Sequence, residues 1–130
     1  MRGSVEPAKN VAMQLSRLSV GILFLALPAL ADTKVDFVKQ IQPIFEKSCV
    51  KCHGAEKQKG KLRVDTLAGV KKGGEDGAVI EAGKSEKSRL VHSVARILDE
   101  DENMPPEGKG DPLTKEQVGL VRAWIDQGAK

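Results

Sequence analysis

Aromatic residues are scarce in this chain of 130 residues, which contains three phenylalanines, one tryptophan and no tyrosine. Phe37, Phe45 and Trp124 are the aromatic residues that follow residue 31. A domain of about 100 residues is already marginal in the apolar area that it can bury. The scarcity of large side chains is therefore compatible with a core that is completed by a large apolar cofactor.

A long hydrophobic run is also missing. The longest apolar stretch, residues 18–31, is shorter than the ~20 residues that a membrane-spanning helix needs. It follows Arg17 and ends in Ala29-Leu30-Ala31, which places small residues where a signal peptidase cleaves. We therefore predict a signal peptide over residues 1–31, with Met13 as a possible true start. A single domain over residues 32–130 would be exported to a bacterial periplasm, touching a membrane only through an uncleaved signal segment.

Charge of one sign does not dominate once this leader is set aside. Residues 1–31 hold three of the 21 Lys and Arg and one of the 18 Asp and Glu, which leaves 18 basic and 17 acidic residues. This balance gives no indication of nucleic-acid binding. The distribution is uneven, because residues 47–72 are mainly basic and residues 99–111 mainly acidic. The basic segment is either a docking surface for an acidic redox protein or an ordinary solvated surface.

The periodicity of apolar residues predicts an all-α domain with long loops. A first helix is expected over residues 36–48, either kinked at Pro43 or regular only from that proline. A short helix over 67–72 would be capped by Asp65 or Thr66, and a longer one over 86–98 by Ser85. The last helix opens with a capping box formed by Thr114 and Gln117 and closes at Gly128. Residues 60–83 are glycine-rich but lack the spacing of a phosphate-binding loop, so we interpret them as turns.

Cysteine is limited to Cys49 and Cys52, and both belong to the pattern Cys49-Val50-Lys51-Cys52-His53. Two thiols one helical turn apart can form thioethers with the two vinyl groups of one porphyrin, and the next histidine then ligates the iron. A disulfide between them would be strained, a thioredoxin-like pair would need a βαβ unit, and a zinc site would need a fourth ligand. The pattern therefore predicts one covalent haem c.

The sixth iron ligand has two candidates. Met104 is the only methionine after residue 31 and precedes Pro105-Pro106. A methionine in a proline-stiffened, charged loop is poorly placed to fill a core, and His/Met ligation raises a haem reduction potential. His92, on the expected helix over 86–98, is the alternative axial ligand.

These residues resemble two related groups of proteins. The Ile44-Phe45 pair before the cysteines and the Met104-Pro105-Pro106 loop before a final helix resemble class I cytochromes c. The resemblance to the planctomycete-type cytochrome c domain is closer. It extends over Ile41–Phe45, Cys52-His53-Gly54, Gly60–Thr66, Gly73-Gly74, Ser88-x-Leu90, Met104-Pro105-Pro106 and Trp124-Ile125-x-x-Gly128-Ala129.

The resemblance implies three to five helices wrapped around one haem, with His53 and Met104 on opposite faces of the iron. It also implies that the first and last helices cross, and Phe45 and Trp124 are the candidates for that contact. Two features depart from the mitochondrial-type pattern. Ile41 stands where such members have a glycine, and no proline between Gly54 and Met104 supplies the carbonyl that usually orients the proximal histidine.

With both axial positions filled, no substrate reaches the iron. We therefore expect a monomeric electron-transfer protein, not an enzyme, that carries single electrons between a donor and an acceptor protein of unknown identity. Two alternatives remain open. One is a haem-based sensor in which a diatomic ligand displaces Met104, and the other is a docking subunit of a larger redox enzyme.

Overall fold

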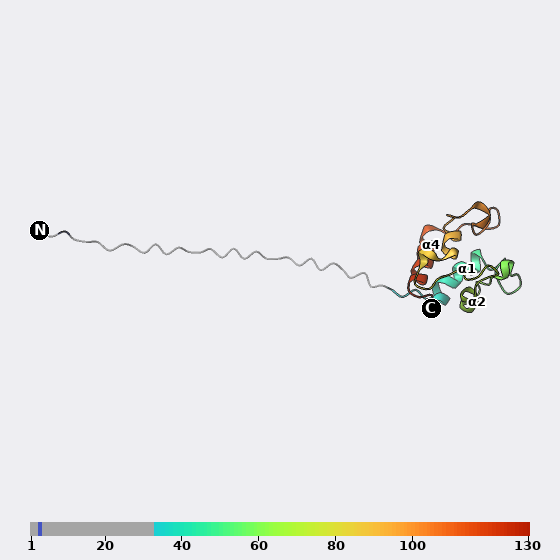
Figure 1. Ribbon diagram of the computed structural model, residues 1–130, viewed down its shortest axis with the longest axis horizontal. Coiled ribbons are helices and arrows are strands. Elements are labelled where there is room, and N and C mark those ends of the chain that lie inside the picture. The colour runs from blue at the N-terminus through green and yellow to red at the C-terminus, as the bar shows by residue number, and fades with distance from the viewer. Residues whose placement is uncertain (1–2, 4–32) are drawn as a thin grey trace. The chain divides into compact units, whose positions relative to one another are not determined.

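The computed structural model describes Gly3 and residues 33–130, and these residues contain four α-helices and no strand (Figure 1). The prediction of an all-α fold is confirmed for this part of the chain. The predicted signal peptide lies outside the described residues. No helix of the described residues is long and apolar enough to cross a membrane.

The first helical segment changes its geometry at Pro43. The Asp36 side chain accepts a hydrogen bond of 2.8 Å from the Lys39 N–H, and a π-helical turn, η1 (Phe37–Ile41), follows. The regular helix α1 (Gln42–Ser48) begins only at the proline. Pro43 has no N–H to donate and its ring clashes with a carbonyl one turn earlier, so an α-helix cannot run through it unchanged. The second of the two expected forms is therefore the correct one.

The glycine-rich region folds as turns around one short helix, as expected. Helix α2 (Leu67–Lys72) is capped by Thr66, whose hydroxyl accepts a 3.0 Å bond from the Gly69 N–H. The helix ends at Gly73, which has a φ of +76° and lies so close to the Gly77 carbonyl that a β-carbon would come within 2.3 Å of its oxygen. Only glycine tolerates both conditions. The loop is held against the 3₁₀ turn η2 (Lys59–Lys61) by a 2.8 Å bond from the Glu75 N–H to the Gly60 carbonyl.

The prediction of one helix over 86–98 capped by Ser85 is wrong at its N-terminal end. A 3₁₀ turn, η3 (Ser85–Lys87), comes first, and helix α3 (Arg89–Val94) begins after Ser88. Ser85 does not cap a helix, because its N–H and its hydroxyl donate to the two oxygens of Asp126, at 2.8 and 2.9 Å. This tertiary contact outweighs the local capping preference of serine.

The same helix also ends earlier than expected. Arg96 takes a left-handed conformation with a φ of +58°, and its guanidinium donates a 2.9 Å hydrogen bond to the Pro105 carbonyl. The chain therefore turns away after Val94, and Ile97, which lies within the range expected for this helix, is 63% exposed. A further 3₁₀ turn, η4 (Glu100–Glu102), follows in the acidic segment.

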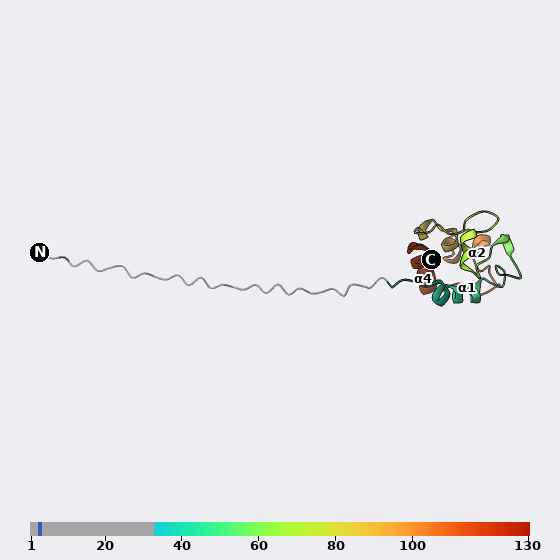
Figure 2. The ribbon, with the colours of Figure 1, turned by 90° about the horizontal axis from the view of Figure 1, so that it is seen from below.

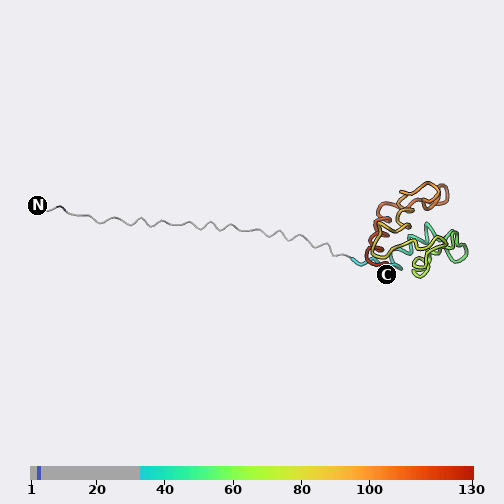
Figure 3. Tube along the Cα trace, in the orientation of Figure 1, coloured from blue at the N-terminus to red at the C-terminus, as the bar shows by residue number. Residues whose placement is uncertain are grey.

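The last helix, α4 (Lys115–Asp126), has the predicted capping box. Thr114 accepts from the Gln117 N–H at 3.2 Å, and Gln117 accepts from the Thr114 N–H at 2.9 Å. The chain leaves the helix through Gly128, which has a φ of +99°. The end of the chain lies beside the first described residues, because the Val35 N–H donates to the Gln127 side chain at 2.7 Å (Figure 3).

Helix α4 packs against the first helical segment chiefly at η1 (Figure 1 and Figure 2), and an aromatic cluster joins η1 and α1 to α4. Trp124 and Phe45 meet edge to face with ring centroids 6.4 Å apart, which confirms the predicted contact. Phe37 adds a third ring, 5.4 Å from Trp124. Ile41, at the position where a glycine was noted in other members, is completely buried. The aromatic side chains are thus concentrated at the helix contact, which leaves the other end of α1 free to form a cavity wall.

Candidate functional site

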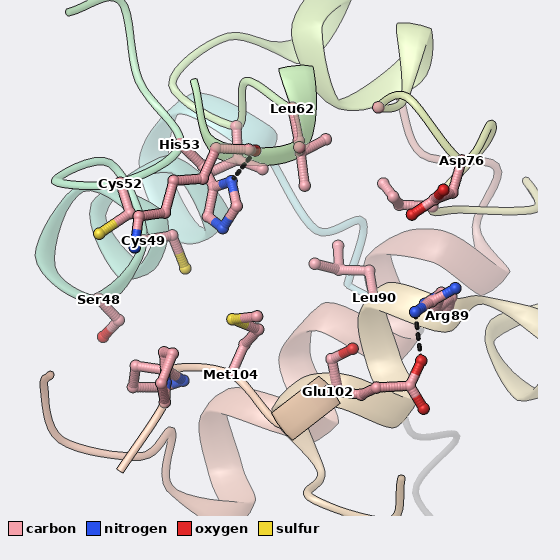
Figure 4. Close-up of a pocket in the computed structure, with 18 of the residues that line it drawn as sticks. Ser48, Cys49, Cys52, His53, Leu62, Asp76, Arg89, Leu90, Glu102 and Met104 are labelled. Atoms are coloured by element: carbon pink, nitrogen blue, oxygen red, sulfur yellow. Dashed lines mark hydrogen bonds and ion pairs between the residues drawn. The ribbon is translucent and has the colours of Figure 1, made fainter. Parts of the chain in front are cut away.

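A cavity of about 740 Å³ lies at the C-terminal end of α1 (Figure 4). Five segments surround it: the Cys49–His53 segment, residues 57–64, the loop of residues 74–79, helix α3, and the loop that contains Met104. Its apolar walls come from Leu62, Val64, Val79 and Leu90. The size is in the range of cofactor sites, which is about 300–1,000 Å³.

The two cysteines occupy one edge of this cavity. The Cys49 N–H continues the helical hydrogen bonding of α1 to the Phe45 carbonyl at 2.8 Å, and the Cys52 N–H donates to the Cys49 carbonyl at 3.1 Å. This turn brings both sulfurs to the same side of the cavity (Figure 4). Both are free thiols, and burial raises the pKa of Cys49 to about 11, so that this thiol is neutral at neutral pH. The described residues contain no group of three or more His, Cys, Asp or Glu able to hold a metal ion by themselves.

A backbone carbonyl that no sequence motif marks orients the His53 ring. Its Nδ1 lies 3.0 Å from the Lys59 carbonyl oxygen. A carbonyl only accepts, so Nδ1 must carry the proton and Nε2 is left unprotonated. Nε2 points into the cavity (Figure 4), and burial lowers the pKa of His53, which favours the neutral ring. The Lys59 carbonyl therefore takes the position of the missing proline carbonyl. A backbone oxygen leaves no mark in the sequence by which it could have been found.

Met104 lies across the cavity from His53, with its side chain turned inward (Figure 4). Its N–H donates to the Ser93 carbonyl at 3.0 Å, which ties the loop to α3. The bond from Arg96 to the Pro105 carbonyl holds the next residue. The predicted proline-stiffened loop is thus anchored at two successive residues, by Ser93 of α3 and by Arg96 in the turn that follows the helix.

His92 does not reach this cavity. It is absent from the residues that line it, and its Nε2 lies 2.8 Å from the Glu86 carbonyl oxygen. The structure therefore brings Cys49, Cys52, His53 and Met104 together and leaves His92 on the outer side of α3. This set offers two thiols along one edge, an unprotonated imidazole nitrogen on one wall and a thioether on the other. Together with the apolar walls, these donors fit a haem.

Residues 49–108 match the family model of the planctomycete cytochrome c. They form a planctomycete-type cytochrome c domain. The match begins at Cys49 and continues past Met104, so it contains all four residues gathered at the cavity. No curated protein and no solved structure matches the chain.

A planctomycete-type cytochrome c domain indicates haem binding and electron transfer. Helices α1 and α4 lie outside the matched segment, but they complete the all-α fold that is expected of a cytochrome c. Residues 49–108 also include the glycine-rich loop and Lys59, so the cytochrome c domain contains both His53 and the carbonyl that orients its ring.

Several lining residues of the cytochrome c domain escaped the sequence reasoning because nothing in their local pattern connects them. Asp76, Arg89 and Glu102 lie at the end of the cavity away from the two cysteines (Figure 4), and Arg89 forms an ion pair with Glu102. Lys51, Lys57 and Lys59 of the predicted basic segment also line the cavity. Four separate parts of the sequence, residues 51–59, Asp76, Arg89 and Glu102, thus supply the charged rim, and only the fold brings them together.

Proposed function

We propose that this protein is a single-haem electron carrier in which Cys49 and Cys52 hold the haem and His53 and Met104 ligate its iron from opposite faces. The observation that carries this proposal is the convergence of these four side chains on one cavity inside a cytochrome c domain. A haem held in this way supplies one-electron chemistry, the iron alternating between the ferrous and ferric states.

Cys49 and Cys52 would hold the haem through its two vinyl groups. Each S–H would add across one vinyl C=C, the S–H bond and the π bond giving way to one C–S and one C–H bond, so that no atom leaves and no oxidant is needed. The position of Cys49 at the last turn of α1 fixes this edge of the cavity to a helix that is anchored by Phe45 and Trp124. A rigid attachment limits the movement that accompanies each change of charge.

His53 and Met104 give the site its character. The Lys59 carbonyl orients His53, holds the proton on Nδ1 and makes Nε2 a better electron donor. Met104 contributes a soft thioether, which favours the reduced state and raises the reduction potential. If His53 and Met104 both held the iron, no position would be left for water or a substrate, and the bound haem would supply electron transfer rather than catalysis.

The working location follows from the same proposal. An exported chain matured in the periplasm would exchange electrons with redox proteins that approach the cavity rim. Lys51, Lys57 and Lys59 line the cavity from the basic segment and favour an acidic partner by electrostatic steering.

The decisive experiment is an absorption spectrum of the protein after periplasmic maturation, recorded oxidised, reduced, and reduced with carbon monoxide. We expect a covalent c-haem spectrum that carbon monoxide does not change promptly. Absence of covalent haem would overturn the proposal. A prompt change with carbon monoxide would contradict permanent Met104 ligation and favour the sensor, and constant co-purification with one enzyme would favour the docking subunit.

A further inference from the structure

The far end of the cavity carries an arrangement of charge that the proposed ligation does not use. Asp76, Arg89 and Glu102 lie there, opposite the two cysteines (Figure 4). Arg89 is the first residue of α3, and its Nη2 is bonded to a carboxylate oxygen of Glu102. The Arg89 side chain is 51% exposed, so the guanidinium stands at the boundary between the cavity and solvent.

The chemistry of haem determines what meets this end. The two vinyl groups are on adjacent pyrrole rings, and the two propionates are on the other two rings. Thioether bonds to Cys49 and Cys52 therefore direct both propionates toward the opposite edge. Given the cavity seen in Figure 4, that edge is the one formed by Asp76, Arg89 and Glu102. This step rests on the proposed function, because it requires the haem to be held by those cysteines.

Two propionates would enter a region that already contains the carboxylates of Asp76 and Glu102, and like charges at close range repel. Arg89 is the one arginine among the described residues that line the cavity. Its planar guanidinium has five N–H donors, enough to keep a bond to Glu102 and to bind a second carboxylate at the same time. The lysines that line the cavity come from residues 51–59 and from Lys109, and none of them belongs to α3.

We propose that Arg89 binds a haem propionate and that Glu102 holds the guanidinium in place for it. Arg89 is then a cofactor-binding residue, and Glu102 acts through it as a positioning residue. A positive charge at the propionate edge also stabilises the reduced iron centre, which has one positive charge less than the oxidised one. Arg89 thus links the orientation of the cofactor to its reduction potential.

The test uses four matured holoproteins: Arg89→Gln, Arg89→Lys, Glu102→Gln and, as a matched control, Arg122→Gln on α4. Arg122 has the same side chain but is not among the residues that line the cavity. Two quantities are measured, the reduction potential and the propionate bending band in the resonance Raman spectrum. The band reports hydrogen bonding to the propionate and does not respond to a distant charge.

For Arg89→Gln we expect a displaced propionate band and a three- to tenfold fall in the ratio of reduced to oxidised protein at a fixed applied potential. That fall corresponds to ~28–59 mV, at 59 mV per tenfold for one electron. Arg89→Lys should restore part of both changes, and Arg122→Gln should give neither. Glu102→Gln should move the band in the same direction as Arg89→Gln but by less, because the guanidinium remains present and is no longer held in place.

An unchanged propionate band in both Arg89→Gln and Glu102→Gln would overturn the proposal and would assign the propionates to other groups. The same result with a normal c-haem spectrum would leave the proposed function standing. A wild-type protein without covalent haem would overturn both. If Arg89→Gln fails to mature, the Glu102→Gln band decides, since that variant keeps the arginine.

Discussion

Replacing Trp124 by alanine should remove a large part of the stability of the folded domain. Trp124 is 1% exposed and contacts the rings of Phe37 and Phe45 at 5.4 and 6.4 Å. Truncation of a buried tryptophan or phenylalanine to alanine costs about 3–5 kcal/mol. The two ring contacts, each worth about 0.5–1.5 kcal/mol beyond the buried area, place Trp124→Ala in the upper half of that range. A domain has only about 5–15 kcal/mol in total.

The measurement is thermal unfolding of the matured holoprotein by far-UV circular dichroism, because the chain has one tryptophan and its removal abolishes that fluorescence signal. For a domain of about 100 residues, 1 kcal/mol corresponds to a change in Tm of about 4–8 °C. A loss of at least about 4 kcal/mol in Trp124→Ala should therefore lower Tm by at least about 16 °C. Trp124→Phe keeps a ring but loses the 3.2 Å bond from Nε1 to the Lys130 carbonyl, so its loss should be about 1–2 kcal/mol.

A matched control comes from Val38, which is 66% exposed on the first helical segment. Val38→Ala should change the free energy of unfolding by less than about 0.5 kcal/mol, as is usual for surface positions. A fall in Tm of less than about 5 °C for Trp124→Ala would refute the reasoning. It would mean that the contact between α1 and α4 contributes little and that other contacts carry the fold.

Three further changes test the site and its supports. Met104→Ala should open one coordination position on the iron, so that the reduced protein binds carbon monoxide at once. His92→Ala should leave the absorption spectra unchanged. The reverse result would identify His92 as the ligand. Gly73→Ala should cost at least about 1–3 kcal/mol in urea unfolding, because its φ of +76° is unfavourable for alanine and the new β-carbon would lie 2.3 Å from the Gly77 oxygen. Thr114→Ala should cost about 1 kcal/mol in the same assay by removing the capping box of α4, and no measurable loss would show that the cap is redundant.

Local signals predicted the elements that depend on local interactions. Thr114 and Gln117 accept hydrogen bonds from each other's backbone N–H groups at the start of α4. Thr66 caps the start of α2 and Gly73 ends it. Both helices therefore lie where the sequence indicates. Helix α3 was predicted too long at both ends because its boundaries depend on distant residues. Ser85 donates to the Asp126 carboxylate, and the Arg96 guanidinium donates to the Pro105 carbonyl. Neither Asp126 nor Pro105 belongs to residues 86–98, so the pattern of those residues does not indicate them.

The sequence by itself determined which reactive side chains this protein has and how they are spaced along the chain. Cys49, Cys52 and His53 are adjacent, so their spacing alone predicts haem attachment, and Met104 is marked by being the single methionine after residue 31. Only the tertiary structure brings these four side chains to one cavity and places the Lys59 carbonyl against His53. It also keeps His92 away from the cavity and sets Arg89 at its charged edge. The physical reason is that covalent spacing specifies which groups can react, whereas orientation and charge environment depend on contacts between segments that are far apart in the chain.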